Sequence, residues 1–226
     1  NAITSILNQS FKEWELIIVD DGSSPKHRKK LLDIIGKIND QRIVPLLQDH
    51  EGLVAARTAG CRIAVADIIA TQDADDLSMP DRLEKCLSVF LRQEVDLVYH
   101  GAYINMWDSQ FNCVTRKYLG CPMVPNKKRL LVEQNLPGWP IFRKKIWEEK
   151  PFRIATEFMY DWMMYLDWLL SGYSFFGVDE GLYEYVRHEN SASITFERDG
   201  RRQQSYEEIK RIVKKELTGE LSEVKV

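Results

Sequence analysis

Apolar and polar positions in the first hundred residues alternate between two periods. Short aliphatic runs predict buried strands over 14–19, 42–47, 68–71 and 95–100. Apolar residues at helical spacing predict helices over 26–38, 52–65 and about 79–93. Strands separated by helices favour an α/β fold, with a Rossmann-type, mostly parallel sheet flanked by helices.

The chain begins in a predicted helix over 2–7, whereas a sheet of this kind is expected to begin with a strand. We therefore expect the first strand to be missing here, either because it lies upstream of residue 1 or because it is absent. The strand over 14–19 is then expected to have an unpaired edge.

The second half of the chain is less regular. Prolines between Gly120 and Ile141 predict loops. The pattern further predicts an aromatic-rich helix over 161–170, strands over 174–178 and 182–187, and a charged helix over 201–216. The apolar face of this last helix is a candidate surface for a homodimer.

Composition narrows the function classes. The chain has 226 residues with a formal net charge of −3, and 44% of its residues are hydrophobic. A nucleic-acid partner would need a basic surplus, so we expect none. No apolar stretch approaches the ~20 residues of a membrane-spanning helix. The four cysteines form no C-x-x-C pair, which favours reduced thiols in a cytoplasmic protein.

Acidic clusters follow two of the predicted strands. Asp20 and Asp21 follow the first strand, and Asp73, Asp75 and Asp76 follow the third. Ligands of α/β sheets bind beyond the carboxyl ends of the strands. Carboxylates gathered at that edge repel one another unless a cation lies between them, so we expect Mn²⁺ or Mg²⁺ and a polyphosphate-bearing ligand.

Each cluster also has a purely structural interpretation. Asp20-Asp21-Gly22-Ser23-Ser24 can be a strand-to-helix turn in which Ser24 caps the helix, and for this cluster alone that interpretation is favoured. The D-x-D pattern alone is a weak motif and can be an acidic turn before the helix that starts near Pro80.

Four other side chains are candidates for chemistry. Arg57, on the alanine-rich helix, can reach a phosphate or lie solvated at the surface. Asp161 can cap its helix or take a proton from a hydroxyl, and Asp167 is a weaker candidate. Arg187 and His188 follow a strand and suit a phosphate or a metal, although a lone histidine on a loop is usually only exposed.

The order of these motifs resembles family 2 of the glycosyltransferases, which have the GT-A fold. The matching segments are Ile6–Phe11, Leu16–Ser23, Gly52–Gly60, Asp73–Asp76 with Met79-Pro80, Tyr160–Trp162 and Tyr185–Ser191. The likeness covers roughly residues 1 to 195. The family usually has asparagine where His50 and Thr58 stand, and often an acidic residue where Tyr160 stands.

The resemblance implies a role for each candidate residue. Binding of the nucleotide sugar is implied for Asp20, Asp21, Arg57, Asp73 and Arg187. A metal beside the diphosphate is implied for Asp75, Asp76 and His188. Asp161 is similar to the carboxylate that deprotonates the acceptor hydroxyl.

The same resemblance implies an inverting, metal-dependent glycosyltransferase. It would move a sugar from a nucleotide-diphosphate donor to a glycan, lipid-linked or other hydroxyl acceptor, in glycan or surface polysaccharide synthesis. We expect a nucleotide-binding half over 1–100, an acceptor-binding half of the same domain over 101–198, and a helical tail over 199–226.

Two other functions remain open from the sequence. A haloacid-dehalogenase-type phosphohydrolase also places D-x-D after a strand, but Leu77 stands where its pattern wants threonine or valine. A truncated or non-catalytic nucleotide-sugar-binding domain is the other. The basic clusters 127–129 and 143–145 are candidates for peripheral contact with anionic lipid at the inner membrane face, with solvated surface as the default explanation.

Overall fold

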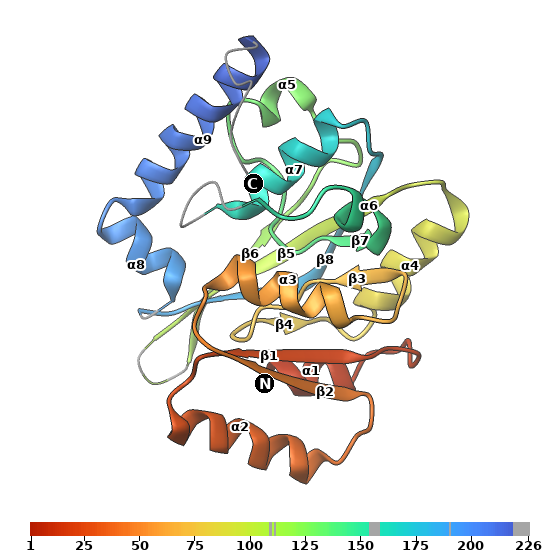
Figure 1. Cartoon of the computed structure of the whole chain (residues 1–226), viewed down its shortest axis with the longest axis vertical. Helices are drawn as coiled ribbons and strands as arrows, with labels where there is room; N and C mark the ends of the chain where they lie inside the picture. Colours follow the sequence, from red (N-terminus) through yellow and green to blue (C-terminus); the bar gives the residue numbers. More distant parts are fainter. Residues whose placement is uncertain (109, 111, 154–158, 190, 219–226) are drawn as a thin grey trace.

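The described part of the chain forms two β-sheets with helices packed around them (Figure 1). The computed structural model describes residues 1–108, 110, 112–153, 159–189 and 191–218. The described strands are β1 (Leu16–Asp21), β2 (Ile43–Gln48), β3 (Ile68–Ala70), β4 (Leu77–Ser78), β5 (Leu97–Trp107), β6 (Cys113–Leu119), β7 (Ile141–Arg143) and β8 (Phe175–Arg187). The described helices are α1 (Ala2–Leu7), α2 (Pro25–Ile38), α3 (Leu53–Ile63), α4 (Arg82–Arg92), α5 (Lys127–Leu130), α6 (Lys144–Glu149), α7 (Tyr160–Leu170), α8 (Ala192–Arg198) and α9 (Arg201–Thr218).

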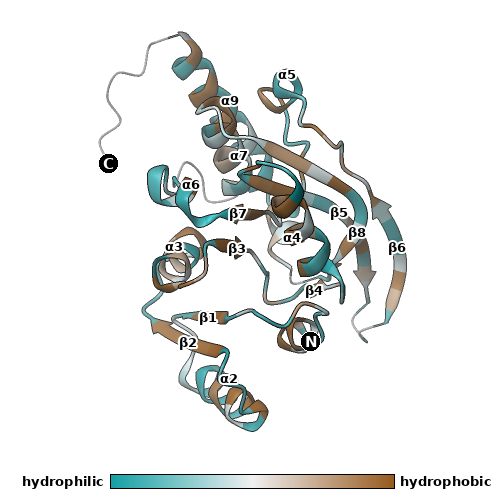
Figure 2. Cartoon of the chain, turned by 90° about the vertical axis from the view of Figure 1, so that its right-hand side faces the viewer, coloured by the Kyte–Doolittle hydropathy of each residue, from teal (hydrophilic) through white to brown (hydrophobic). Residues whose placement is uncertain are grey.

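The smaller sheet consists of β1 and β2, which run parallel. Helix α2 lies on its outer side, and α3 lies between this sheet and the rest of the molecule (Figure 2). Gly60 of α3 faces β1, since a Cβ built on it would lie 3.4 Å from Val19 Cγ2, in ordinary van der Waals contact. Within the described residues β1 pairs with β2 alone, and the unpaired edge expected from the sequence is present.

The larger sheet is mixed rather than mostly parallel, which corrects the expectation from the sequence. Its strands lie in the order β3-β7-β5-β8-β4, with β6 also paired to β5. Among its described strand pairs, only β5 and β8 run parallel. Strands β5 and β6 run antiparallel, and beside their ends the Asp108 N–H donates to the Asn112 carbonyl at 3.0 Å. The five residues that separate the two strands in the sequence are too few for the long crossover that a parallel pair needs.

Strand β5 is buried on both faces of this sheet. Leu97 and Tyr99 pack into the cluster that contains α7, and Val98 packs into the cluster that contains α4. The alternation follows from the two-residue period of a strand. Helix α9 joins the α7 cluster through Ile209 and Val213, so the apolar face considered for a homodimer packs within the chain.

Several element boundaries differ from the predictions. Strand β8 is continuous where two strands were expected, and β5 extends to Trp107. The predicted boundary near residue 100 falls inside β5, so the two proposed halves share a strand. In the second basic cluster, Arg143 and Lys144 donate to backbone carbonyls of Val95 and Ala64, at 2.9 and 2.7 Å. No helix in the described ranges has the length and apolar character needed to cross a bilayer.

Candidate active site

Asp20 and Asp21, at the end of β1, bind groups of their own chain. Asp20 is buried and accepts hydrogen bonds from Ser23 N at 3.1 Å and Arg28 Nε at 2.6 Å. Hydrogen bonding by Ser23, and then by Arg28, outweighs burial and holds the Asp20 pKa below its ordinary value. Asp21 accepts from the backbone N–H groups of Glu51 and Gly52, both at 2.9 Å. Both carboxylates therefore order the turns that lead into α2 and α3, and a role in nucleobase binding stays a prediction.

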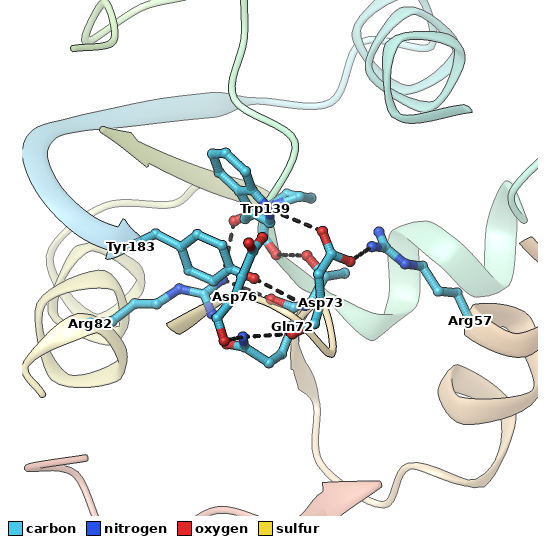
Figure 3. A network of polar contacts seen from close by, with 9 residues as sticks. Arg57, Gln72, Asp73, Asp76, Arg82, Trp139 and Tyr183 are labelled. Carbon is cyan, nitrogen blue, oxygen red and sulfur yellow. Dashed lines mark hydrogen bonds and ion pairs between the residues drawn. The ribbon is translucent and has the colours of Figure 1, made fainter. Parts of the chain in front are cut away.

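Asp73 is held by side chains from three other parts of the chain (Figure 3). Arg57 of α3 forms an ion pair with it, and Trp139 Nε1 donates to its Oδ2 at 3.1 Å. Its backbone N–H donates to the Tyr183 hydroxyl of β8 at 3.0 Å. Trp139 stacks on Tyr183 with ring centroids 4.6 Å apart. The first D-x-D aspartate is thus fixed in place before any ligand binds.

A buried arginine anchors the loop that carries these aspartates. Arg82, the first residue of α4, is fully buried and donates to Ser78 Oγ, His100 Nε2 and the Thr71 carbonyl, each at 2.9 Å. Burial, and then the Arg82 charge, lower the His100 pKa to about 3, so His100 is neutral and its Nε2 accepts the bond. Arg82 also lies 4.8 Å from the centre of the Tyr183 ring (Figure 3).

Asp75 and Asp76 point to different surroundings. The Asp75 side chain is 49% exposed, and its Oδ2 lies 3.9 Å from His188 Nε2. Asp76 is fully buried, and its Oδ1 accepts from Val186 N at 2.8 Å. Burial, with a smaller effect from Asp73, raises the pKa of Asp76 to about 8. The described residues contain no group of three or more histidine, cysteine or acidic side chains that could hold a metal.

Asp161 lies at the start of α7, beside the loop that carries Trp139. Its Oδ2 accepts a hydrogen bond from Gln134 Nε2. A Cβ on Gly138 would lie 2.8 Å from that oxygen, so a larger residue at 138 would displace the carboxylate. Burial raises the pKa of Asp161, while the Arg57 charge opposes this and Asp73 adds to it. Asp161 is therefore in the electrostatic field of the same Arg57 that pairs with Asp73.

Two guanidinium groups present buried N–H donors without an acceptor among the described residues. These donors are Arg57 Nη1 and Arg187 Nε. Arg187 also binds Glu197 through Nη2 at 2.6 Å. A buried donor without a partner costs on the order of 1–3 kcal/mol, so these two groups are suited to an anionic ligand.

The structure therefore brings together some of the predicted residues and separates others. Arg57, Asp73 and Asp161 form one cluster, and Asp75 faces His188. Asp20 and Asp21 are the last residues of β1 in the smaller sheet, and the carboxylate of Asp76 lies in the interior. The sequence interpretation missed three residues that fix the aspartate loop: Arg82, Trp139 and Tyr183. The prolines around Trp139 predicted a loop, but no local pattern indicated which aspartate it would contact.

Comparison with known proteins now identifies the family. The model of the family described as Glycosyl transferase family 2 matches residues 1–166. The chain is 32% identical over 99 residues to an Escherichia coli protein named UDP-Glc:alpha-D-GlcNAc-diphosphoundecaprenol beta-1,3-glucosyltransferase WfgD, covering 43% of this chain and 38% of that protein. It is 31% identical over 148 residues to WcaA of Escherichia coli K12, a glycosyl transferase named for colanic acid biosynthesis, covering 62% of this chain and 50% of WcaA. The chain thus spans half or less of the length of these two relatives.

The fold is similar to that of a solved structure. The crystal structure of S. aureus TarS 1-349 in complex with UDP-GlcNAc matches with a TM-score of 0.61 at 17% sequence identity, covering 84% of this chain and 55% of that chain. This likeness confirms the α/β, GT-A-like fold that the sequence predicts. Together with the match over residues 1–166, it leads to one conclusion: the chain belongs to glycosyl transferase family 2.

Proposed function

We propose that this chain is the catalytic part of an inverting glycosyltransferase, which transfers a sugar from a nucleotide-diphosphate donor to a hydroxyl acceptor in polysaccharide assembly. One observation carries the proposal. Arg57 pairs with Asp73 of the D-x-D motif and also acts on the carboxylate of Asp161. A donor-binding acid and a base candidate therefore share one cation. The names of WfgD and WcaA support polysaccharide assembly as the context.

Binding of the donor uses the groups that have no acceptor among the described residues. Arg57 Nη1 and Arg187 Nε are buried donors suited to the diphosphate oxygens. Asp73 is held by Arg57 and Trp139, and its carboxylate can accept ribose hydroxyls. TarS, which shares the fold, forms a complex with UDP-GlcNAc, and this makes UDP-sugars the first donors to test.

Asp75 and His188 offer two ligands for a divalent cation, and the remaining ligands would come from substrate phosphates and water. A carboxylate oxygen and an imidazole nitrogen lie 3.9 Å apart, and Oδ2 of the buried Asp76 has no hydrogen-bond partner among the described residues. Mn²⁺ accepts both oxygen and nitrogen ligands, and Mg²⁺ prefers oxygens with substrate phosphates completing its shell. We propose that Asp75 and His188 hold this ion, with Asp76 in support. When bound, the ion supplies positive charge beside the departing diphosphate.

Asp161 is the proposed base. Its carboxylate takes the proton of the acceptor hydroxyl while that oxygen forms a bond to the anomeric carbon. The bond from that carbon to the diphosphate oxygen breaks on the opposite side, and the electron pair leaves with the nucleoside diphosphate. One displacement of this kind inverts the anomeric centre. Burial strengthens Asp161 as a base because it raises the pKa of the side chain.

The decisive experiment measures nucleotide diphosphate release from a panel of UDP-, GDP- and dTDP-sugars, with Mn²⁺ and simple glycoside acceptors. Asp161→Asn should lower turnover by about 10²–10⁴-fold. Nucleotide affinity measured by calorimetry should be kept. Asp167→Asn is the matched control, because this aspartate of the same helix binds Arg153 at 2.6 Å instead. Parental turnover in Asp161→Asn would show that the assigned base is wrong.

The same assay separates the alternative functions. Phosphate release from monoesters would favour the phosphohydrolase, and nucleotide-sugar binding without turnover would favour a binding domain. Asp75→Ala should remove the effect of Mn²⁺ on nucleotide affinity. Equal affinity of the parent protein with and without a chelator would contradict the metal site.

A further inference from the structure

A cavity of about 420 Å³ lies beside Asp161, between the segment after α5 and helices α8 and α9. Its lining includes Glu133, Gln134, Met159, Glu197, Arg202 and Gln203. The volume is within the range of about 300–1,000 Å³ that is usual for small-molecule sites. We propose that this cavity binds an uncharged, polyhydroxylated sugar unit of the acceptor, an inference that rests on the proposed function.

Two residues that line the cavity lie next to the proposed base, Asp161, in the structure or in the sequence. Gln134 lines the cavity and donates its amide N–H to Asp161 Oδ2. Met159 lines it as well, two residues before Asp161, with a left-handed backbone at φ +64°. Such a conformation is costly for a residue other than glycine and is often retained at functional sites. An acceptor hydroxyl that enters from the cavity reaches Asp161 by replacing the Gln134 amide.

Another residue that lines the cavity contacts one of the proposed diphosphate-binding residues. Glu197 lines the cavity and accepts from Arg187 Nη2 at 2.6 Å. Arg187 ends β8, and the next residue, His188, lies 3.9 Å from Asp75. One residue of the cavity wall, Glu197, therefore contacts the proposed diphosphate site, and another, Gln134, contacts Asp161. Displacement requires the acceptor and the departing group on opposite sides of the anomeric carbon.

The side chains that line the cavity are hydrogen-bonding groups suited to hydroxyls. Carboxylates accept hydroxyl protons, amides accept and donate, and a guanidinium donates, which together suit a ligand rich in hydroxyls. Glu197 already binds both Arg187 and Arg202, and Glu133 binds Arg129. Arg202 in the lining, and Arg187 and Arg129 near it, are thus already paired with carboxylates. This charge balance favours an uncharged sugar over a phosphate or a carboxylated ligand, which would meet two glutamates.

The test compares two neighbouring substitutions on α9. Gln203 lines the cavity, whereas Gln204 is exposed and lies outside the lining. Gln203→Trp should fill the cavity, and Gln204→Trp adds the same bulk elsewhere. Binding is measured by saturation-transfer NMR with methyl β-D-glucopyranoside and the corresponding galactose and N-acetylglucosamine glycosides.

We expect the parent protein and Gln204→Trp to bind at least one glycoside, and Gln203→Trp to lose that binding. Equal binding by both variants, or no binding of any glycoside to the parent, would overturn the proposal. Transfer kinetics separate this proposal from the proposed function. Gln204→Trp should release nucleotide diphosphate to water at the parental rate, and in Gln203→Trp the KM for the glycoside should rise roughly tenfold or more. Donor turnover with an unchanged glycoside KM would reject the cavity alone, whereas failure of nucleotide sugars to bind the parent would reject the proposed function.

Discussion

The aspartates of the D-x-D region and the aspartate at the start of α7 are the same residue type, but they differ in burial and in bonding partners. Asp73 is paired with Arg57, Asp75 is half-exposed, Asp76 is fully buried, and Asp161 is bound by Gln134. The sequence identified all four as candidates because each follows a strand or begins a helix. It did not distinguish them, since burial and partners depend on segments far away in the chain, such as the loop that carries Trp139.

The raised pKa of Asp161 predicts a particular pH dependence. The side chain acts as a base only when ionised, so kcat/KM should rise with pH through a pKa above the usual 3.8. The folded chain also holds this proton more tightly than the unfolded chain, so the contribution of Asp161 to stability falls as pH rises from 3.8 through the raised pKa. Asp161→Asn should therefore unfold at an equal or higher temperature than the parent at neutral pH. An acidic limb at the ordinary aspartate pKa, together with a lower unfolding temperature, would contradict this prediction.

Trp139 is expected to position Asp73. Trp139→Phe keeps an aromatic ring against Tyr183 but removes the N–H that donates to Asp73 Oδ2 at 3.1 Å. We expect the donor KM to rise roughly five- to tenfold, because a hydrogen bond to a charged group is worth about 1.5–3 kcal/mol and Arg57 still holds the carboxylate. Steady-state kinetics with varied donor will test this.

Trp147→Phe is the matched control for that variant. It removes a buried indole N–H that has no hydrogen-bond partner among the described residues. Its donor KM should equal that of the parent. If both tryptophan variants change the donor KM alike, the effect comes from core packing and not from the bond to Asp73.

At the scale of elements, α4 and the aspartate loop form one unit. The sequence correctly predicted a helix after Pro80, from its proline and its apolar spacing. It did not predict that the first residue of this helix, Arg82, would be buried against Thr71, Ser78 and His100. A charged residue at a helix start usually indicates a solvated end. Here His100 of β5 and Tyr183 of β8 contact it, and these contacts depend on tertiary packing.

Replacing Arg82 should destabilise the fold strongly. Arg82→Met leaves a ring nitrogen, a hydroxyl and a carbonyl buried without their donor, at a cost of about 1–3 kcal/mol each. We expect the free energy of unfolding to fall by roughly 3 kcal/mol or more, as measured by urea denaturation. Arg92→Met, at the exposed end of the same helix, should change it by about 0.5 kcal/mol or less. Similar losses in the two variants would show that the network does not hold the loop.

At the scale of the whole molecule, the sequence predicted the smaller sheet better than the larger one. The sequence predicted the β1–β2 pair and α2 and α3 well, because alternating strands and helices determine a local parallel unit. It failed for the larger sheet, where β5 contacts β6, β7 and β8. These pairings join segments up to about eighty residues apart, and the periodicity of one segment does not specify its partner.

The two sheets should also differ in how fast their backbone amides exchange. A two-stranded sheet is marginal by itself, and β1 has an unpaired edge within the described residues. Strand β5 is buried on both faces between paired neighbours. We expect peptides covering β1 and β2 to exchange well before those covering β5 and β8 in hydrogen–deuterium exchange mass spectrometry. Uniform protection across both sheets would mean that they open as a single unit.

The charge of Arg57, which pairs with Asp73 and acts to lower the pKa of Asp161, has a kinetic consequence. Its positive charge weakens Asp161 as a proton acceptor in the free protein. Negative charge brought by a donor diphosphate would offset that influence and make Asp161 more basic. The enzyme would then be poorly equipped to activate an acceptor that arrives early. This electrostatic arrangement favours a compulsory sequence, in which the nucleotide sugar is seated before the acceptor oxygen becomes reactive.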